Sequence, residues 1–166
     1  MIVEKRKLYE VYTDYNEDSF FVSFIVSKNE SLFIIEKFDR NGEFDGVSIL
    51  RADSILKMNS CTGYLKKYET MKYVEIENFG TLEKDRTILD ILTQIKKANK
   101  LLSLYVIDET YIIGNLVDIH LDQDSVIIEL NVYSEDQSSF DGNCLINIDN
   151  VQEISMETKF LRFLSN

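Results

Sequence analysis

An internal repeat constrains the fold of this chain more than any other feature. Residues 44–68 and 140–164 align without a gap. Both copies begin with Phe-Asp-Gly and share a second Asp, a Thr and a Leu further on, and their apolar positions coincide. A repeated segment of this kind indicates one structural unit used twice. We therefore expect two domains, residues 1–80 and residues 81–166.

Short apolar or alternating segments, separated by polar turns, predict five strands in each copy. In the first copy they are residues 7–13, 19–27, 31–38, 47–51 and 54–58. In the second copy they are residues 102–107, 111–121, 125–133, 145–148 and 151–154. A helical turn is expected after each set, at 64–68 and 158–164, and a further edge strand at 71–78. Five short strands with tight turns predict a small β-barrel, closed or partly open, because a barrel leaves few exposed sheet edges.

One segment, residues 85–102, has the periodicity of an amphipathic helix. Its apolar residues form a single stripe: Ile88, Ile91, Leu92, Ile95, Ala98 and Leu102. Asp85 is expected to cap the N-terminus of this helix. The apolar stripe must be covered, and we expect it to pack between the two copies. The alternative is that a partner protein covers it.

Acidic residues are concentrated in the second copy. The formal net charge of the chain is -11. Residues 101–166 hold 12 acidic and 2 basic side chains and so contribute -10 to this net charge. Such a field repels nucleic acid and anionic lipid and attracts cationic partners. The simpler explanation of the charge is solubility.

Nothing in the sequence predicts export or a membrane span. Residues 1–7 are charged and no apolar segment follows them, so no signal peptide is expected. The longest apolar runs are shorter than the roughly 20 residues that a spanning helix needs. We expect a cytoplasmic protein in which Cys61 and Cys144 are reduced.

The repeated motif consists of Phe44, Asp45 and Gly46 and, in the second copy, of Phe140, Asp141 and Gly142. We interpret it as structural. Both glycines are expected to adopt a positive φ angle or to form a bulge, and both aspartates to bond turn amides. Both phenylalanines are expected to plug the barrel. The alternative is a loop that contacts a ligand.

Four polar residues alternate along one expected strand of the second copy: Asp118, His120, Asp122 and Asp124. Alternate residues of a strand share a face, so the first three would point the same way while Val117, Ile119 and Leu121 point to the core. Carboxylates with an imidazole suit a divalent metal. A solvated strand end explains the same pattern, and we favour it over a metal site.

Catalytic motifs are not found in the sequence. The chain has a single histidine without a neighbouring nucleophile motif, and its six glycines are scattered singly. We expect neither enzymatic activity nor a cofactor. A metal-dependent enzyme built on the aspartates of the second copy is the least favoured alternative.

The run ILRADSILKM, residues 49–58, resembles the second motif of the Sm/LSm-like small barrels, in which an apolar pair, Arg-Gly, two residues and an apolar residue form the last two strands. The whole pattern is also similar to uncharacterised bacterial proteins built on such barrels. The resemblance implies a mainly β chain of two tandem five-stranded small β-barrels (Sm/SH3-like), joined by the amphipathic helix that leads into the second barrel.

RNA-binding members of that family pair the arginine of the motif with an Asp-x-x-apolar-Asn run in an earlier turn. Arg51 would supply the arginine here, followed by Ala52 instead of glycine. The turn at 27–31 does not carry Asp and Asn at the family's places, and the second copy has Asn147 and Ile148 instead of Arg-Gly.

These observations predict a non-enzymatic binding or scaffold module whose acidic second half favours a basic protein partner. Sm-like RNA binding through Arg51 is the alternative. We expect a protein partner or self-association rather than nucleic acid, because the second copy lacks the interleaved basic residues that a nucleic-acid platform needs.

Overall fold

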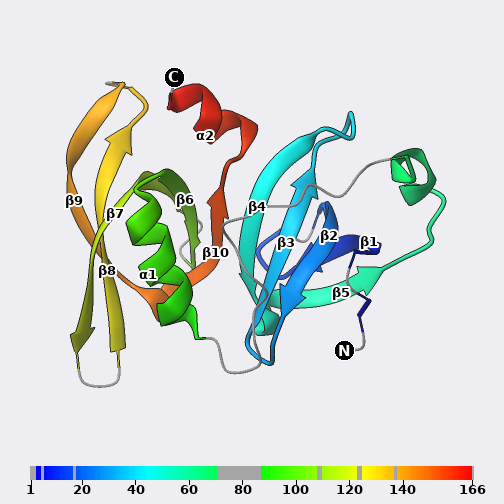
Figure 1. The fold of residues 1–166 in the computed structure, drawn as a ribbon, viewed down its shortest axis with the longest axis horizontal. Coiled ribbons are helices and arrows are strands. Elements are labelled where there is room, and N and C mark those ends of the chain that lie inside the picture. Colours follow the sequence, from blue (N-terminus) through cyan, green and yellow to red (C-terminus); the bar gives the residue numbers. More distant parts are fainter. Residues whose placement is uncertain are drawn as a thin grey trace. The chain divides into compact units, whose positions relative to one another are not determined.

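The computed structural model describes residues 3–4, 6–16, 18–70, 87–107, 110–122, 125–136 and 138–165. The chain divides into two compact units, Met1–Asp85 and Arg86–Asn166 (Figure 1). The described residues are mainly β, with ten strands and two α-helices. The expected edge strand at 71–78 lies outside the described residues.

The first unit is an antiparallel sheet with the strand order β5-β1-β2-β3-β4. Its elements are β1 (Leu8–Thr13), β2 (Phe21–Lys28), β3 (Leu32–Phe38), β4 (Phe44–Arg51), the 3-10 turn η1 (Ala52–Ser54), β5 (Ile55–Asn59) and the 3-10 turn η2 (Leu65–Tyr68).

The second unit begins with a helix and repeats this arrangement in the strand order β10-β6-β7-β8-β9. Its elements are α1 (Ile88–Ala98), β6 (Leu101–Val106), β7 (Tyr111–Asp122), β8 (Ser125–Ser134), β9 (Ser139–Asn147), the 3-10 turn η3 (Ile148–Asn150), β10 (Val151–Met156) and α2 (Lys159–Leu164). In each unit the fifth strand therefore lies beside the first, and a 3-10 turn joins the fourth strand to the fifth. In neither unit do the described residues pair the fourth strand with the fifth, so each sheet is open and the closed barrel stays a prediction.

Strand irregularities also recur at matching places. In each unit the second strand has one extra residue against the third, at Val26 and at Val117. The fifth strand has one extra residue against the first, at Leu56 and at Gln152. Bulges bend a strand and increase its twist. Two units with the same strand order and the same bulges agree with a duplicated ancestor.

The Phe-Asp-Gly motif forms a third shared bulge, and it lies inside a strand. Residues 44–47 of β4 oppose residues 36–38 of β3, and residues 140–143 of β9 oppose residues 131–133 of β8, so each motif adds one residue. Gly46 and Gly142 have φ angles of 91° and 84°, as expected for a position that only glycine adopts without strain. The two strands therefore begin earlier than the expected residues 47 and 145, because a bulge continues the ladder through the glycine.

The two phenylalanines of the motif differ in their surroundings. Phe44 is partly buried against the cluster of Val22, Phe24, Phe38, Leu65 and Tyr68. Phe140 is 45% exposed and contacts Tyr133 edge to face. The prediction that both would plug a barrel is therefore wrong for Phe140, because the residues around it differ from those around Phe44.

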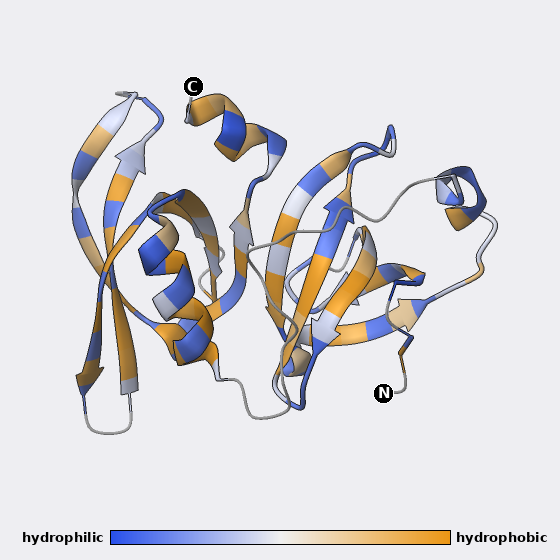
Figure 2. Cartoon of the chain, in the orientation of Figure 1, coloured by the Kyte–Doolittle hydropathy of each residue, from blue (hydrophilic) through white to orange (hydrophobic). Residues whose placement is uncertain are grey.

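Two apolar clusters can be distinguished among the described core residues of the first unit. One is the cluster around Phe24, and the other consists of Tyr9, Val11, Ile25, Phe33, Ile35, Leu50 and Ile55. Residues of β3 that lie between cluster members are buried as well, Leu32, Ile34 and Glu36. Figure 2 shows hydrophobic and hydrophilic bands along the strands. Each fully buried large apolar side chain contributes about 1.5–3 kcal/mol of transfer free energy.

The helix α1 is shorter than the sequence predicted. Thr87 caps it: its side chain accepts from the Asp90 N–H while the Asp90 carboxylate accepts from the Thr87 N–H, a reciprocal capping box. The expected cap, Asp85, lies outside the described residues. Asn99 ends the helix in the left-handed conformation (φ 49°), and the next residues enter β6. The apolar stripe is confirmed at its buried residues Ile91, Leu92 and Ile95, and the helix contacts β7 of its own unit.

Cys61 and Cys144, which were expected to be reduced, are both free thiols. Among the described residues there is no helix with the length and apolar character required to cross a bilayer.

Candidate functional site

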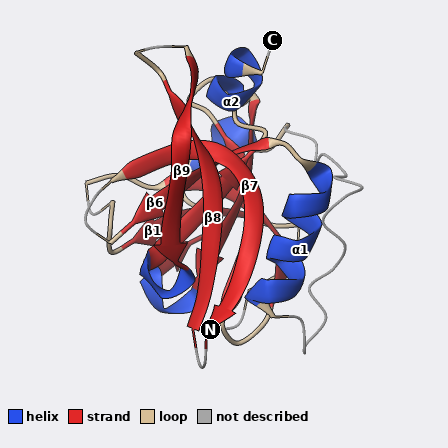
Figure 3. Cartoon of the chain, turned by 90° about the vertical axis from the view of Figure 1, so that its left-hand side faces the viewer, coloured by secondary structure: helices blue, strands red, loops and turns tan. Residues whose placement is uncertain are grey.

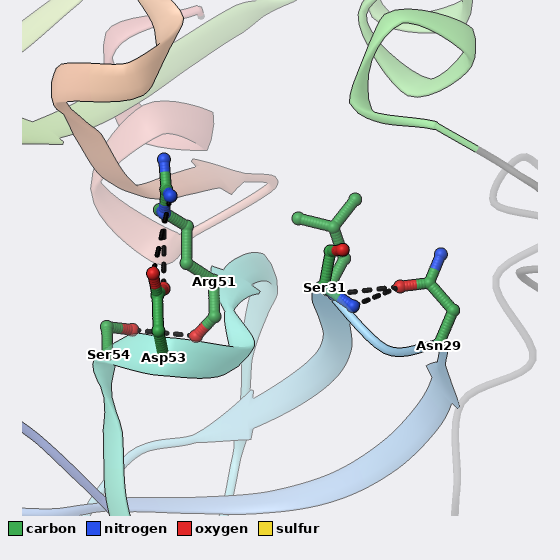
Figure 4. A network of polar contacts seen from close by, with 6 residues as sticks. Asn29, Ser31, Arg51, Asp53 and Ser54 are labelled. Atoms are coloured by element: carbon green, nitrogen blue, oxygen red, sulfur yellow. Dashed lines mark hydrogen bonds and ion pairs between the residues drawn. The ribbon is translucent and has the colours of Figure 1, made fainter.

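The turn that joins β4 to β5 carries Arg51, the residue on which the family resemblance depends. Its guanidinium group binds the Asp53 carboxylate through two nearly parallel contacts, Nε to Oδ1 at 3.2 Å and Nη2 to Oδ2 at 3.3 Å (Figure 4). This bond holds the pKa of Asp53 below its ordinary value. The Ser54 hydroxyl donates to the Arg51 carbonyl at 2.8 Å and so tightens the turn.

A second turn, between β2 and β3, lies beside the first. The Ala52 N–H donates to the Ser31 carbonyl at 2.8 Å, which joins the two turns. Asn29 shapes this second turn, because its Oδ1 accepts from the N–H groups of Ser31 (2.9 Å) and Leu32 (2.8 Å) (Figure 4). Asn29 does not stand out in the sequence, because a single Asn at a turn is ordinary turn chemistry.

The matching turn of the second unit has no arginine. Asn147 stands there, and its Oδ1 accepts from the Asp149 N–H at 2.9 Å. A planar cationic group that could bind a phosphate is thus present at this turn in the first unit only. There it is already bound to a carboxylate, with which an anionic ligand would compete.

The candidate metal residues Asp118, His120 and Asp122 lie on β7 but do not come together as a metal site. Asp118 binds Lys96 of α1 at 2.6 Å and also accepts from the Ile119 N–H at 2.8 Å. Both contacts favour the ionised carboxylate, with Lys96 the larger cause, and keep the pKa of Asp118 below its ordinary value. Asp122 is exposed at the end of β7. Asp124 lies outside the described residues.

His120 is bound to a carboxylate that the sequence analysis did not consider. Its Nε2 lies 3.0 Å from Oε2 of Glu129 on β8. Among the described residues there is no group of three or more His, Cys, Asp and Glu side chains that could hold a metal ion. Glu129 could have been found from the sequence only with the correct β7–β8 register, which the bulge at Val117 shifts by one residue.

Two residues of β7 depart from the expected burial. Val117 and Leu121 were expected in the core, but they are 43% and 67% exposed. Val117 is the extra residue of the bulge, and Leu121 lies near the end of β7, beyond the residues that pair with β6. Asp118 and His120 keep the outward face that alternation predicts, so alternation fails only for the burial of these two apolar side chains.

The outward face of β7, β8 and β9 gathers polar groups around Glu129. Register places Asp118, Glu129 and Leu145 in one row across the three strands. Glu129 accepts from the Asn143 amide at 2.6 Å in addition to its contact with His120. We call this face, defined by Asp118, His120, Glu129, Asn143 and Leu145, the outer face of the second unit; Figure 3 shows its three strands side by side.

β9 is the last strand of its sheet. It pairs with β8 on one side, and no other described strand pairs with it on the other. Six of its nine residues are exposed, including Asp141 and Leu145. The backbone N–H and C=O groups of an edge strand can pair with another extended chain. β9 therefore combines an open backbone edge with a neighbouring acidic face.

Comparisons with known proteins add no family. Models of known protein families gave no match, and neither the curated proteins nor the solved structures contain a significant match to the chain.

Proposed function

We propose that the protein is a non-enzymatic binding module whose second unit captures a basic, extended segment of a partner protein along β9. The observation that carries the proposal is the open edge of β9 beside the carboxylates of the outer face. A segment that added itself to β9 as a further strand would gain backbone hydrogen bonds, and its alternate side chains would face the outer face.

The negative charge of the second unit favours partner segments that carry lysine or arginine. Glu129 is 23% exposed, Asp141 lies on β9 itself, and residues 101–166 carry a net charge of -10. Lysine or arginine side chains at every second position of the partner strand would lie against these carboxylates. Such contacts raise the association rate and weaken as salt screens them.

The experiment is a fluorescence-anisotropy titration of the full chain with a labelled peptide of alternating lysine and valine. Binding is expected at low salt, with an affinity that falls as salt is added. Asp141→Lys should weaken it roughly tenfold, since one attractive contact becomes repulsive. Glu30→Lys is the matched control: it makes the same change of charge on an exposed residue of the first unit and should leave the affinity within about twofold.

The same peptide with alternate backbone N-methyl groups tests the mode of binding. N-methylation keeps the charge but removes the N–H donors that a strand needs, so binding should be lost. If the N-methylated peptide binds as well as the parent, capture along β9 is wrong. If Glu30→Lys weakens binding as much as Asp141→Lys, the net charge and not β9 is responsible.

We infer that the scaffold of both units is a small barrel of the Sm/SH3 kind, of the partly open form. The support is the strand order, with the fifth strand beside the first, together with the 3-10 turn between the fourth and fifth strands. The three shared bulges supply the bending that such a barrel requires.

RNA binding at the Arg51 turn is the second candidate function. The observation that favours it is the hydrogen bond between the Arg51 and Asn29 turns, which brings a guanidinium group and an amide side chain to one side of the unit. Filter binding of single-stranded RNA tests it. Arg51→Ala should weaken retention and reduce the salt dependence by about one unit of slope. Absence of retention at low salt excludes this function.

A further inference from the structure

Each unit has a cleft at the same place, between its terminal helical turn and the beginning of its first strand. The cleft of the first unit has a volume of about 430 Å³ and is lined by Arg6, Lys7, Leu8, Phe24, Cys61, Thr62, Leu65 and Glu69. The cleft of the second unit is larger, about 560 Å³, and is lined by Asn99, Lys100, Leu101, Asn115, Tyr133, Phe140, Glu157, Leu161, Arg162, Leu164 and Ser165.

The strand register shows that the two clefts are equivalent. Leu8 pairs with Phe24 as Leu101 pairs with Asn115, so Asn115 holds the place of Phe24. Phe38 pairs with Phe44 as Tyr133 pairs with Phe140.

The terminal turns match as well. Thr62 accepts from the Leu65 N–H at 3.3 Å, and Thr158 accepts from the Leu161 N–H at 3.1 Å. The residues just before these threonines, Cys61 and Glu157, both have left-handed φ angles, 59° and 54°. The alignment of the two copies then places Leu164 opposite Tyr68.

In the first unit aromatic side chains fill this region. Phe24 packs edge to face on Phe38, with 5.4 Å between the ring centroids. Tyr68 joins the same cluster, is 1% exposed, and donates through its hydroxyl to the Asp39 carbonyl at 3.2 Å. Phe44 covers the cluster from β4.

The second unit lacks this aromatic filling. Asn115 stands at the place of Phe24, and Leu164 at the place of Tyr68. The phenyl ring of Phe24 and the phenol ring of Tyr68 therefore have no counterpart beside Tyr133 and Phe140. This explains why Phe140 is exposed where Phe44 is covered. Oδ1 of Asn115 is buried and has no hydrogen-bond partner among the described residues. A buried acceptor without a donor costs roughly 1–3 kcal/mol, a cost that a ligand with a suitable donor would remove.

The rim of the cleft carries two cations and one carboxylate. Lys100 binds Glu157, and Arg162 donates to the Glu157 carbonyl at 2.6 Å. The side chain of Lys100 is 60% exposed, so it can reorient toward a ligand at little cost. The rim is therefore net positive within a strongly acidic unit and attracts an anion.

We propose that the cleft of the second unit binds a small aromatic carboxylic acid whose ring carries a hydrogen-bond donor. The ring takes the space that Phe24 fills in the first unit and stacks against Tyr133 and Phe140. The donor of the ring bonds Oδ1 of Asn115, and the carboxylate binds Lys100 and Arg162. The volume of the cleft lies in the range of about 300–1,000 Å³ that is usual for small-molecule sites. The proposal does not depend on strand capture by β9, although Phe140 of β9 lines the cleft.

Indole-3-acetate is the probe, because it has a planar ring, an N–H donor and a carboxylate. The chain has no tryptophan, so indole fluorescence reports the ligand alone when the full chain is titrated. Saturable binding is expected. Naphthalene-1-acetate, which lacks the N–H group, and indole-3-acetamide, which lacks the charge, should each bind about tenfold more weakly or worse.

Variants locate the site. Asn115→Phe restores the residue of the first unit, fills the cleft and should abolish binding. Asn115→Leu keeps the number and branching of the side-chain heavy atoms and serves if the larger ring disturbs folding; it should weaken binding about tenfold, because the acceptor is gone. Lys100→Ala should weaken binding of indole-3-acetate but not of indole-3-acetamide. Lys97→Ala, on the exposed side of α1 outside the cleft, is the matched control and should change neither.

The proposal is overturned if indole-3-acetate does not bind the unaltered chain. It is equally overturned if folded Asn115→Phe and Asn115→Leu, checked by circular dichroism, bind the probe as the unaltered chain does. An equal effect of Lys97→Ala and Lys100→Ala would show that charge alone attracts the probe, which also rejects the cleft.

Discussion

The hydroxyl of Thr62 donates a hydrogen bond to the carboxyl group of Glu10, a residue of β1 that is only 4% exposed. Tyr12 and Asn59 complete the set of donors to this carboxyl group, at 3.3 Å and 3.2 Å. The bond joins the segment after β5 to the first strand, and it has no counterpart at Thr158, for which only the helix-capping contact is seen among the described residues.

Thr62→Val should therefore destabilise the first unit by about 1–3 kcal/mol, because a buried carboxyl group loses a donor and the Leu65 N–H loses its acceptor. Thr158→Val removes only a cap and should cost the second unit less, about 0.5–2 kcal/mol. Urea unfolding followed by NMR signals of each unit measures both. Equal losses would mean that the Glu10 contact adds nothing to stability.

Gly46 and Gly142 should each resist replacement by alanine. Their φ angles of 91° and 84° lie where an L-residue is strained by roughly 1–2 kcal/mol. At Gly142 a Cβ would meet nothing within 4 Å, so strain alone is measured there. Gly63 is the matched control: it also has open space around it, but its φ is not positive. Gly63→Ala should be neutral or slightly stabilising. A melting temperature that falls as much for Gly63→Ala as for Gly142→Ala would contradict backbone strain at Gly142.

The ion pair of Asp118 and Lys96 should be visible in an acid titration. The folded-state pKa of Asp118 is held below the ordinary value of 3.8, so the ionised group stabilises the fold above pH 3.8. This stabilisation is lost as the pH falls through the folded-state pKa. Lys96→Met should raise the pKa of Asp118 toward 3.8 but not to it, since the Ile119 N–H still donates. The NMR chemical shift of the Asp118 carboxyl carbon, followed against pH, measures this pKa. Lys97→Met is the control and should leave the pKa of Asp118 unchanged.

Asp53→Asn should free the Arg51 guanidinium from its bidentate partner. If the Arg51 turn binds RNA, this variant should bind more tightly than the unaltered chain and with a salt dependence steeper by about one phosphate contact. Arg51→Ala is the opposing control. Filter binding in which both variants weaken retention equally would show that the ion pair itself, and not the arginine, supports the site.

The repeat and the approximate positions of the strands could be predicted because they depend on local patterns. Six shared identities and matched apolar positions mark the copies, and the two glycines predict positive φ angles at the place where bulges occur. The helical stripe of α1 was found by its period. Its ends were not, because Thr87 competes with Asp85 as a cap and Asn99 ends the helix in a conformation that propensity does not fix.

What depends on register could not be predicted. The bulge at Val117 leaves Val117 outside the core and sets Glu129 beside His120, and a sequence does not show where a strand gains a residue. The equivalence of Asn115 and Phe24 was hidden for the same reason. The gap-free alignment begins at residue 44, and the preceding strands are separated by loops of unequal length.

The bulge at Gly142 has a consequence for how the chain avoids indiscriminate assembly. A flat, regular outer strand would accept any exposed strand and would promote aggregation. β9 is bent at its third and fourth residues and carries a carboxylate there, so an incoming strand must follow the bend and tolerate the charge. The backbone conformation of β9 thus helps to select the strands that can pair with it. A mutation that straightened β9 is expected to let other strands pair with it before it lowers the stability of the fold.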